Sequence, residues 1–78
     1  DVRMSLLLKE DGDRVRVSIR SKKGTSANRC SRQHFNGGGH ENAAGGRLYI
    51  PDDIKDIREA GEYVERHTHI FFTEENEA

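Results

Sequence analysis

The chain has 78 residues and a formal net charge of −1, with a hydrophobic share of 32% and no tryptophan. A chain of this length forms one small domain with a thin core, since such domains bury only about 60% of their unfolded surface. Its single cysteine excludes an internal disulfide and fits a reducing, cytoplasmic location. No apolar run approaches the length of a membrane span, so we expect no signal peptide and no membrane partner.

The net charge conceals an asymmetry along the chain. Residues 1–50 carry ten Lys and Arg against five Asp and Glu, whereas residues 51–78 carry three against nine. Between Arg14 and His40 there are seven basic residues and no acidic one. Such a block is either an ordinary solvated face or a surface for a phosphorylated partner, and charge alone does not decide between them.

Two strands joined by a tight turn are predicted near the start of the chain. Apolar and polar residues alternate over residues 2–9 and again over residues 14–20, as they do in half-buried strands. The Asp11-Gly12 dipeptide between them is typical of a hairpin turn. In the second strand, three β-branched side chains share one face and three arginines share the other.

A short amphipathic helix is predicted next. Thr25 or Ser26 can cap its N-terminus, and weakly apolar residues follow at helical spacing as far as the glycines. We interpret Cys30 as a packing residue rather than a reactive thiol, because it lies on this stripe. His34 is expected on the helix surface.

The last third of the chain is predicted to contain a strand, a helix and an acidic tail. Residues 47–50 form the strand, which Pro51 ends, and the helix covers residues 52–67 with acidic residues in its first turns. Residues 70–72 are expected as an edge strand, and residues 74–77 as a fraying tail. Together the elements predict an α+β fold, with a small, largely antiparallel sheet and helices packed on one face.

The glycine-rich stretch from Asn36 to Gly46 is the most distinctive feature of the sequence. Its three successive glycines can expose backbone N–H groups as an anion-binding concavity, and Asn36 tolerates the left-handed conformation that a bend requires. Residues 40–44 can begin a helical turn that adds positive charge there. A flexible linker is disfavoured because His, Asn and Ala residues interrupt the glycines. A Walker-type loop is disfavoured because the Gly-Lys-Ser/Thr ending is absent.

One combination of residues resembles a known family. It consists of an Arg-Ser pair at the end of the second strand, then a helix, then a Gly-Gly-Gly-His sequence, at Arg20, Ser21, Gly37, Gly38, Gly39 and His40. This is similar to the DHH-associated C-terminal domain of the DHH phosphoesterases, which include RecJ-type exonucleases, cyclic dinucleotide phosphodiesterases and nano-RNase/3′-phosphoadenosine-5′-phosphate (pAp) phosphatases. The spacing is most similar to the bacterial nano-RNase/pAp phosphatase branch. The family usually has a fourth glycine where this chain has Asn36.

The resemblance implies a division of labour between two domains. Residues 1–78 would form a single substrate-binding domain, the C-terminal part of a longer protein. The family's DHH domain, which this sequence lacks, would hold two divalent ions, usually manganese, and would carry out the hydrolysis. We therefore expect no catalytic residue, metal site or cofactor in this chain, and no activity from it alone. His67 and His69 form a His-x-His pair, but no third metal ligand is evident near them.

The same resemblance assigns phosphate and substrate binding to the six matched positions. Arg20 offers a planar guanidinium suited to phosphate oxygens, Ser21 offers a hydroxyl, and His40 can donate a hydrogen bond to an anion. The expected partners are a phosphorylated nucleotide or short single-stranded RNA or DNA, together with the protein's own DHH domain. The whole protein would then hydrolyse short oligoribonucleotides, pAp, or both.

Two alternatives and several residue roles stay open. The chain could be a non-catalytic nucleic-acid-binding module similar to the C-terminal domain of alanyl-tRNA synthetases, which carries a related glycine-histidine motif. It could also be a structural domain whose glycine loop is only architecture. Asn42 could brace the loop or touch substrate, and Lys22, Lys23 and Arg47 could add to the phosphate field or remain solvated.

Overall fold

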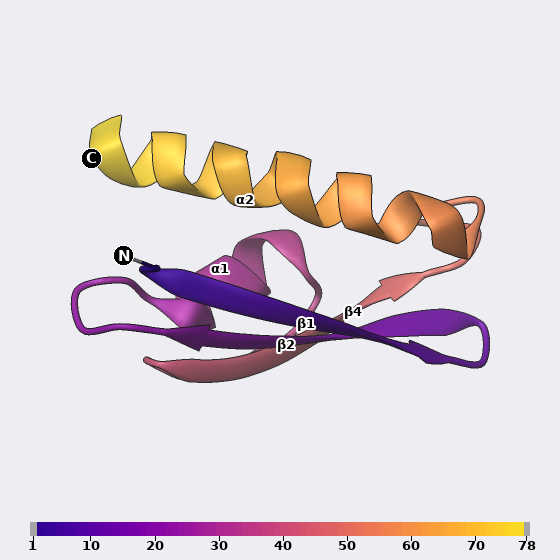
Figure 1. The fold of residues 1–78 in the computed structure, drawn as a ribbon, viewed down its shortest axis with the longest axis horizontal. Helices are drawn as coiled ribbons and strands as arrows, with labels where there is room; N and C mark the ends of the chain where they lie inside the picture. Colours follow the sequence, from indigo (N-terminus) through magenta and orange to yellow (C-terminus); the bar gives the residue numbers. More distant parts are fainter. Residues whose placement is uncertain (1, 78) are drawn as a thin grey trace.

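The alternating segments near the start of the chain form the hairpin that their pattern predicts. In the computed structural model, which describes residues 2–77, β1 (Met4–Asp11) pairs antiparallel with β2 (Arg14–Ser21) (Figure 1). Gly12 and Asp13 make the turn, and Gly12 takes a left-handed φ of 66° that suits glycine. The apolar residues of β2 are buried and its arginines are exposed, as the alternation requires.

Two further strands complete an antiparallel sheet of order β1-β2-β4-β3. β4 (Ala43–Tyr49) pairs with β2, and the short β3 (Gly38–His40) pairs with β4 at the edge. The predicted helical turn over residues 40–44 was wrong, because this segment pairs as two strands instead. β4 therefore begins four residues before the predicted start at residue 47.

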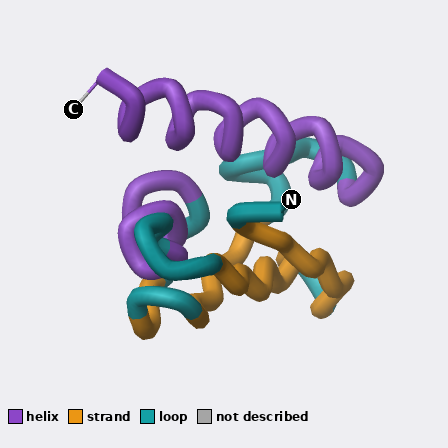
Figure 2. Tube along the Cα trace, turned by 60° about the vertical axis from the view of Figure 1, so that its left-hand side comes forward, coloured by secondary structure: helices purple, strands orange, loops and turns teal. Residues whose placement is uncertain are grey.

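Both helices lie on the same side of the sheet (Figures 1 and 2). α1 (Ala27–His34) is the predicted short helix, and Ser26 caps it by accepting a hydrogen bond from the Arg29 N–H at 3.0 Å. α2 (Ala60–Glu77) follows a single 3₁₀ turn, η1 (Ile57–Glu59). The prediction of an α+β fold with helices on one face is confirmed.

The C-terminal helix begins later and continues further than predicted. Residues 52–56 form turns, and Asp56 caps η1 by accepting from the Arg58 N–H at 2.8 Å. The predicted edge strand over residues 70–72 was wrong: these residues belong to α2, because Phe71 is fully buried on its inner side. The predicted fraying of the acidic tail was also wrong at its first residues, which are helical and contact α1.

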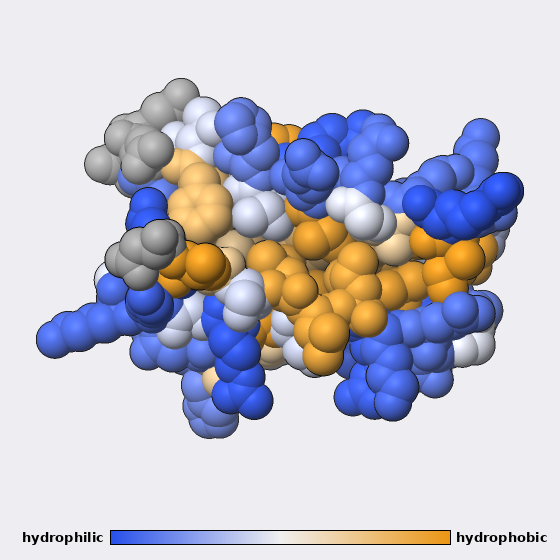
Figure 3. Space-filling model, in the orientation of Figure 1, coloured by the Kyte–Doolittle hydropathy of each residue, from blue (hydrophilic) through white to orange (hydrophobic). Residues whose placement is uncertain are grey.

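The core lies between the sheet and the two helices. It contains Val15, Val17, Ile19, Ala27, Cys30, Phe35, Leu48, Ile54, Ala60, Val64 and Phe71. Burial raises the pKa of the Cys30 thiol to about 12, so this thiol stays protonated, and its interpretation as a packing residue is confirmed. Figure 3 shows that apolar side chains also reach the surface in a band between α2 and β1, whose half-buried members include Met4, Leu6 and Leu8.

No helix among residues 2–77 is both long and apolar enough to cross a membrane. What the fold does provide is one helix-covered face and one uncovered face of the sheet. The uncovered face is called the open face below.

Candidate functional site

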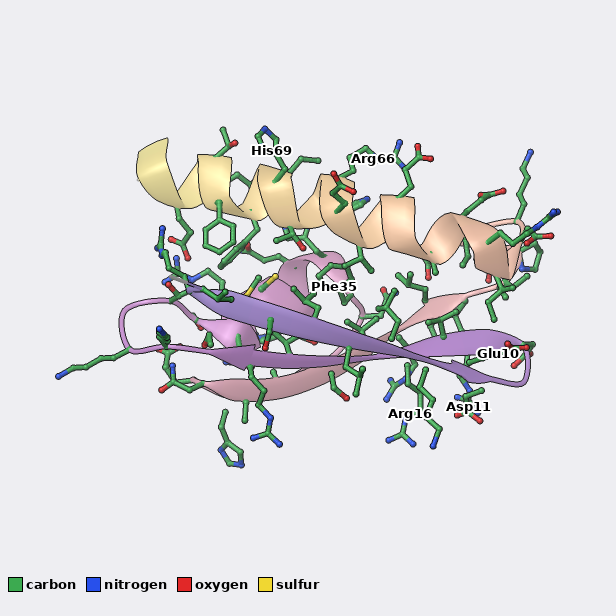
Figure 4. All side chains as sticks on the ribbon, viewed as in Figure 1. Glu10, Asp11, Arg16, Phe35, Arg66 and His69 are labelled. Carbon is green, nitrogen blue, oxygen red and sulfur yellow. The ribbon has the colours of Figure 1, made fainter. Side chains whose placement is uncertain are left out.

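The strand register arranges the open face in cross-strand rows. Side chains alternate between the two faces, so residues directly opposite one another on paired strands share a face. The first row consists of Ser5, Arg20, Ala43 and His40. The second row consists of Leu7, Ser18, Gly45 and Gly38, and the third row of Lys9, Arg16 and Arg47. Figure 4 shows Arg16 on the side of the sheet away from α2, which places the rows on the open face.

A cavity of about 250 Å³ lies over the first and second rows. Its lining residues are Ser18, Arg20, Gly38, Gly39, Ala43, Ala44 and Gly45. Arg20 and His40 both lie opposite Ala43, one on each neighbouring strand, so their backbones are two strand spacings, about 10 Å, apart. Only the Ala43 methyl group lies between them in the row. Their longer side chains can therefore close on a small group from two sides.

The Arg20 and His40 side chains are both free to bind a ligand. Both residues are exposed, and within residues 2–77 neither side chain forms a hydrogen bond or an ion pair. A guanidinium that lines the cavity and an imidazole in the same row offer several N–H donors and no acidic group. The structure thus brings together on one face the two long side chains that the motif singled out.

Ser21, the third polar residue of the motif, is already engaged inside the fold. Its hydroxyl donates to the Thr25 carbonyl oxygen at 2.7 Å and accepts from Asn42 Nδ2 at 3.2 Å. Asn42 Nδ2 also donates to the Lys22 carbonyl oxygen at 3.0 Å. The Asn42 side chain therefore stabilises this loop, and the Ser21 hydroxyl is hydrogen-bonded within it.

The three glycines do not form the predicted concavity of exposed amides. The Gly37 N–H donates to the Ser31 carbonyl oxygen at 3.2 Å, and the Gly39 N–H donates to Asn28 Oδ1 at 3.0 Å. That prediction was wrong because buried or edge N–H groups are satisfied within the fold, here by α1.

Close packing explains two of these glycines instead. A Cβ on Gly37 would strike the Gly45 carbonyl oxygen and lie 2.7 Å from Ser31 Oγ. A Cβ on Gly39, which has a φ of 154°, would lie 2.7 Å from Ala44 Cα. Asn36 takes the left-handed conformation that the bend requires, with a φ of 56°. Gly38 has room for a side chain, and an added Cβ would contact α1, with Asn28 Oδ1 3.4 Å away.

Two residues of α1 that lie beside the glycines, Asn28 and Arg32, were not singled out from the sequence. Asn28 holds the Gly39 amide, and Arg32 runs alongside Gly38, where its Cγ lies 3.4 Å from an added Cβ. A second cavity of about 550 Å³ borders them, and it is lined by Ser26, Asn28, Arg29, Arg32, Gln33 and Glu41. The i, i+4 spacing of Asn28 and Arg32 on the helix before the glycines could have predicted this, because it places both side chains on one side of the helix.

The remaining histidines lie away from the open face. His34 Nδ1 is 3.1 Å from His67 Nδ1, and His34 Nε2 is 3.2 Å from Glu74 Oε1, between α1 and α2. The prediction of His34 on the helix surface was wrong, since only 10% of its side chain is exposed. Burial, followed by the charges of His34 and Arg66, lowers the pKa of His67. Among the described residues no three His, Cys, Asp or Glu side chains gather as a metal site would require.

Comparison with known proteins identifies the family. Residues 1–66 match the family model of the DHHA1 domain. The chain belongs to the DHHA1 domain family. This DHHA1 domain is similar to part of an exopolyphosphatase-related protein from Bacteroides fragilis, at 34% identity over 90% of the chain and with a TM-score of 0.74. The match covers 19% of that protein, so the chain spans about a fifth of its length. No curated protein gave a significant match.

The family match confirms the resemblance drawn from the Arg-Ser pair and the Gly-Gly-Gly-His sequence. The nano-RNase/pAp phosphatase branch within the DHH phosphoesterases remains a prediction.

Proposed function

We propose that this DHHA1 domain is the substrate-binding domain of a DHH-family phosphoesterase. On this proposal its open face holds a phosphorylated nucleotide or a short single-stranded oligonucleotide, and a DHH domain of the same protein cleaves it. The supporting observation is the cavity of about 250 Å³ that Arg20 lines, together with the register that places His40 on the same face, across Ala43 from Arg20. It combines room for a phosphate group with unpaired donors on two sides.

The chemistry of these side chains suits a phosphate. The Arg20 guanidinium can bind two phosphate oxygens at once, and a ring N–H of His40 can donate to a third. Hydrogen bonds to charged groups are worth about 1.5–3 kcal/mol each. Gly38 and Gly39 leave the floor of the cavity without side chains, so the phosphate can approach the sheet closely. The domain would thus orient the ester and neutralise its charge.

The metal ions of such an enzyme would belong to the other domain. The family resemblance implies two divalent ions, with manganese the expected metal, and the described residues offer no cluster that fits them. When bound, such ions activate water for attack on the ester. Short oligoribonucleotides and pAp are the substrates we propose for the whole protein, because the open face carries a surplus of basic side chains.

The test is the kinetics of two alanine variants in the full-length protein that contains this chain. Arg20→Ala and His40→Ala should each lower kcat/KM for pAp or a short oligoribonucleotide by about tenfold to a hundredfold, since each loses a charge-assisted bond. The melting temperature should stay unchanged because both side chains are exposed. Arg66→Ala, on the outer side of α2, is the matched control (Figure 4). Unchanged kcat/KM in both variants would remove these residues from the site.

A further inference from the structure

The third row of the open face is a line of three cations with no opposite charge. Lys9 lies directly opposite Arg16, and Arg16 directly opposite Arg47. All three are exposed, and within residues 2–77 none has an ion-pair partner for its side chain. Asp11, the acidic residue of β1 on this face, pairs with Arg14 at 3.9 Å. Like charges directly opposite each other destabilise a sheet, so this row does not serve the fold.

The third row stands at a defined distance from the first. Arg16 and Arg20 are four residues apart on β2, which is about 13 Å along a strand. The second row between them is uncharged, and three of its members are Ser or Gly. The fourth, Leu7, is an apolar side chain that is 70% exposed. Along the strands the open face therefore alternates between charged, uncharged and charged rows.

We propose that the third row is a second anion subsite, which binds another phosphate of a single-stranded oligonucleotide already held at Arg20 and His40. This inference rests on the proposed function and extends it to the class of substrate. The alternating rows match a chain in which charged phosphates alternate with uncharged sugars and bases. An inorganic polyphosphate is charged at every unit, and the uncharged second row interrupts the cations that it would need.

Leu7 supplies the second reason to choose an oligonucleotide. Its exposed side chain lies in the row between the two cationic rows, where a base or sugar of a bound strand would pass. Apolar surface at this point favours the organic part of a nucleotide and offers nothing to a bare phosphate. The domain would therefore select by length, since a mononucleotide reaches only the first row.

The experiment is calorimetric titration of the full-length protein with three probes: adenosine 5′-monophosphate, a hydrolysis-resistant phosphorothioate tetra-adenylate, and inorganic tripolyphosphate. The double variant Arg16→Ala/Arg47→Ala should weaken tetra-adenylate binding at least tenfold and change adenosine monophosphate binding less than twofold. The slope of log K against log salt for tetra-adenylate should fall by about 1.4, or 0.7 for each of two lost contacts. Lys55→Ala/Arg66→Ala removes the same charge elsewhere and should change neither affinity by more than twofold.

Four outcomes would overturn the inference. In the first, Arg16→Ala/Arg47→Ala binds tetra-adenylate within twofold of the Lys55→Ala/Arg66→Ala control. In the second, Arg16→Ala/Arg47→Ala loses as much affinity for adenosine monophosphate as for tetra-adenylate. In the third, tripolyphosphate binds the wild type as tightly as tetra-adenylate does, and the double variant loses as much affinity for tripolyphosphate as for tetra-adenylate. The fourth is Leu7→Ser with unchanged tetra-adenylate affinity, since this variant should weaken that probe and spare tripolyphosphate.

The two proposals fail separately in this design. Unchanged mononucleotide affinity in Arg20→Ala counts against the proposed function. The role of the third row is tested separately, by comparing how much affinity Arg16→Ala/Arg47→Ala loses for tetra-adenylate and for adenosine monophosphate. Circular dichroism melts check the fold, and the double variant should be at least as stable as the wild type because like-charge repulsion is removed. If the double variant unfolds, the single variants Arg16→Gln and Arg47→Gln replace it. Each should weaken tetra-adenylate binding and leave adenosine monophosphate binding unchanged.

Discussion

Gly46 lies where β4 packs against Phe35 at the end of α1. A Cβ at this position would fall on the carbonyl oxygen of Phe35 and lie 2.8 Å from the Phe35 Cβ. The same carbonyl oxygen accepts the Arg47 N–H at 2.6 Å, so it is held in place. Gly61, in the first turn of α2, has no neighbour within 4 Å of an added Cβ. Two glycines of one chain thus tolerate a methyl group very differently.

Gly46→Ala should therefore lower the free energy of unfolding by about 1–3 kcal/mol or more, the range found for overpacked cores. Gly61→Ala should raise it by up to about 1 kcal/mol, because alanine is the better helix former. Urea denaturation of the two variants and the wild type measures both effects. Equal stability of Gly46→Ala and the wild type would show that β4 and α1 can separate without loss.

The motif predicts which residue types form the candidate site, but it does not predict their hydrogen bonds. Arg20 and His40 were chosen from the motif, and the register places them on one face. The motif could not reveal that Asn28, eleven residues before Gly39, satisfies the Gly39 amide. Nor could it reveal that the Ser21 hydroxyl is bonded to Thr25. Both depend on contacts across the fold that spacing in the sequence does not encode.

At the scale of elements, local patterns predicted the hairpin and α1. Their alternation, turn dipeptide and cap are read from neighbouring residues. Residues 43–46 are Ala-Ala-Gly-Gly, which has little strand propensity, and they are a strand because β2 and β3 flank them. Residues 70–72 are a short apolar run, which fits a strand or a helix equally well. Burial of Phe71 against the core decides for the helix.

The contact between α1 and α2 depends on two histidines. His34 and His67 face each other across the interface, Glu74 contacts the other side of His34, and Tyr63 stacks on His67 with ring centroids 4.0 Å apart. Burial and the charges of His34 and Arg66 lower the pKa of His67, while Asp53 opposes this weakly. Protonation of His67 therefore disfavours the packed interface.

This interface should make stability depend on pH. Because the folded-state pKa of His67 is lowered, the unfolded state binds a proton more readily, and stability is lost as the pH falls below about 6.5. The melting temperature of the wild type should fall between pH 7.5 and pH 5.5, and that of His67→Gln should fall less. Thermal melts across this range provide the measurement. Parallel pH profiles for the two proteins would mean that His67 is not the group responsible.

At the scale of the whole molecule, the charge asymmetry of the sequence becomes an asymmetry of faces. The open face carries Lys9, Arg14, Arg16, Arg20 and Arg47 against one acid, Asp11. α2, on the opposite side, carries the exposed acids Glu62, Glu65 and Glu74. A polyanion is attracted to the first side and repelled from the second. The near-zero net charge thus conceals one basic face and one acidic side of the molecule.

Lysine acetylation in the full-length protein can test on which face the ligand binds, because Lys9 lies on the open face and Lys55 lies outside the sheet. Lys9 belongs to the third row of the open face, and Lys55 is exposed in the turns that lead to η1. Bound tetra-adenylate should protect Lys9 from acetylation and leave Lys55 unchanged, as read by mass spectrometry of peptides from each site. Protection should fade as salt is raised, since phosphate contacts release counterions. Protection of Lys55 with Lys9 still reactive would place the ligand on the helix side and contradict the open face as the binding surface.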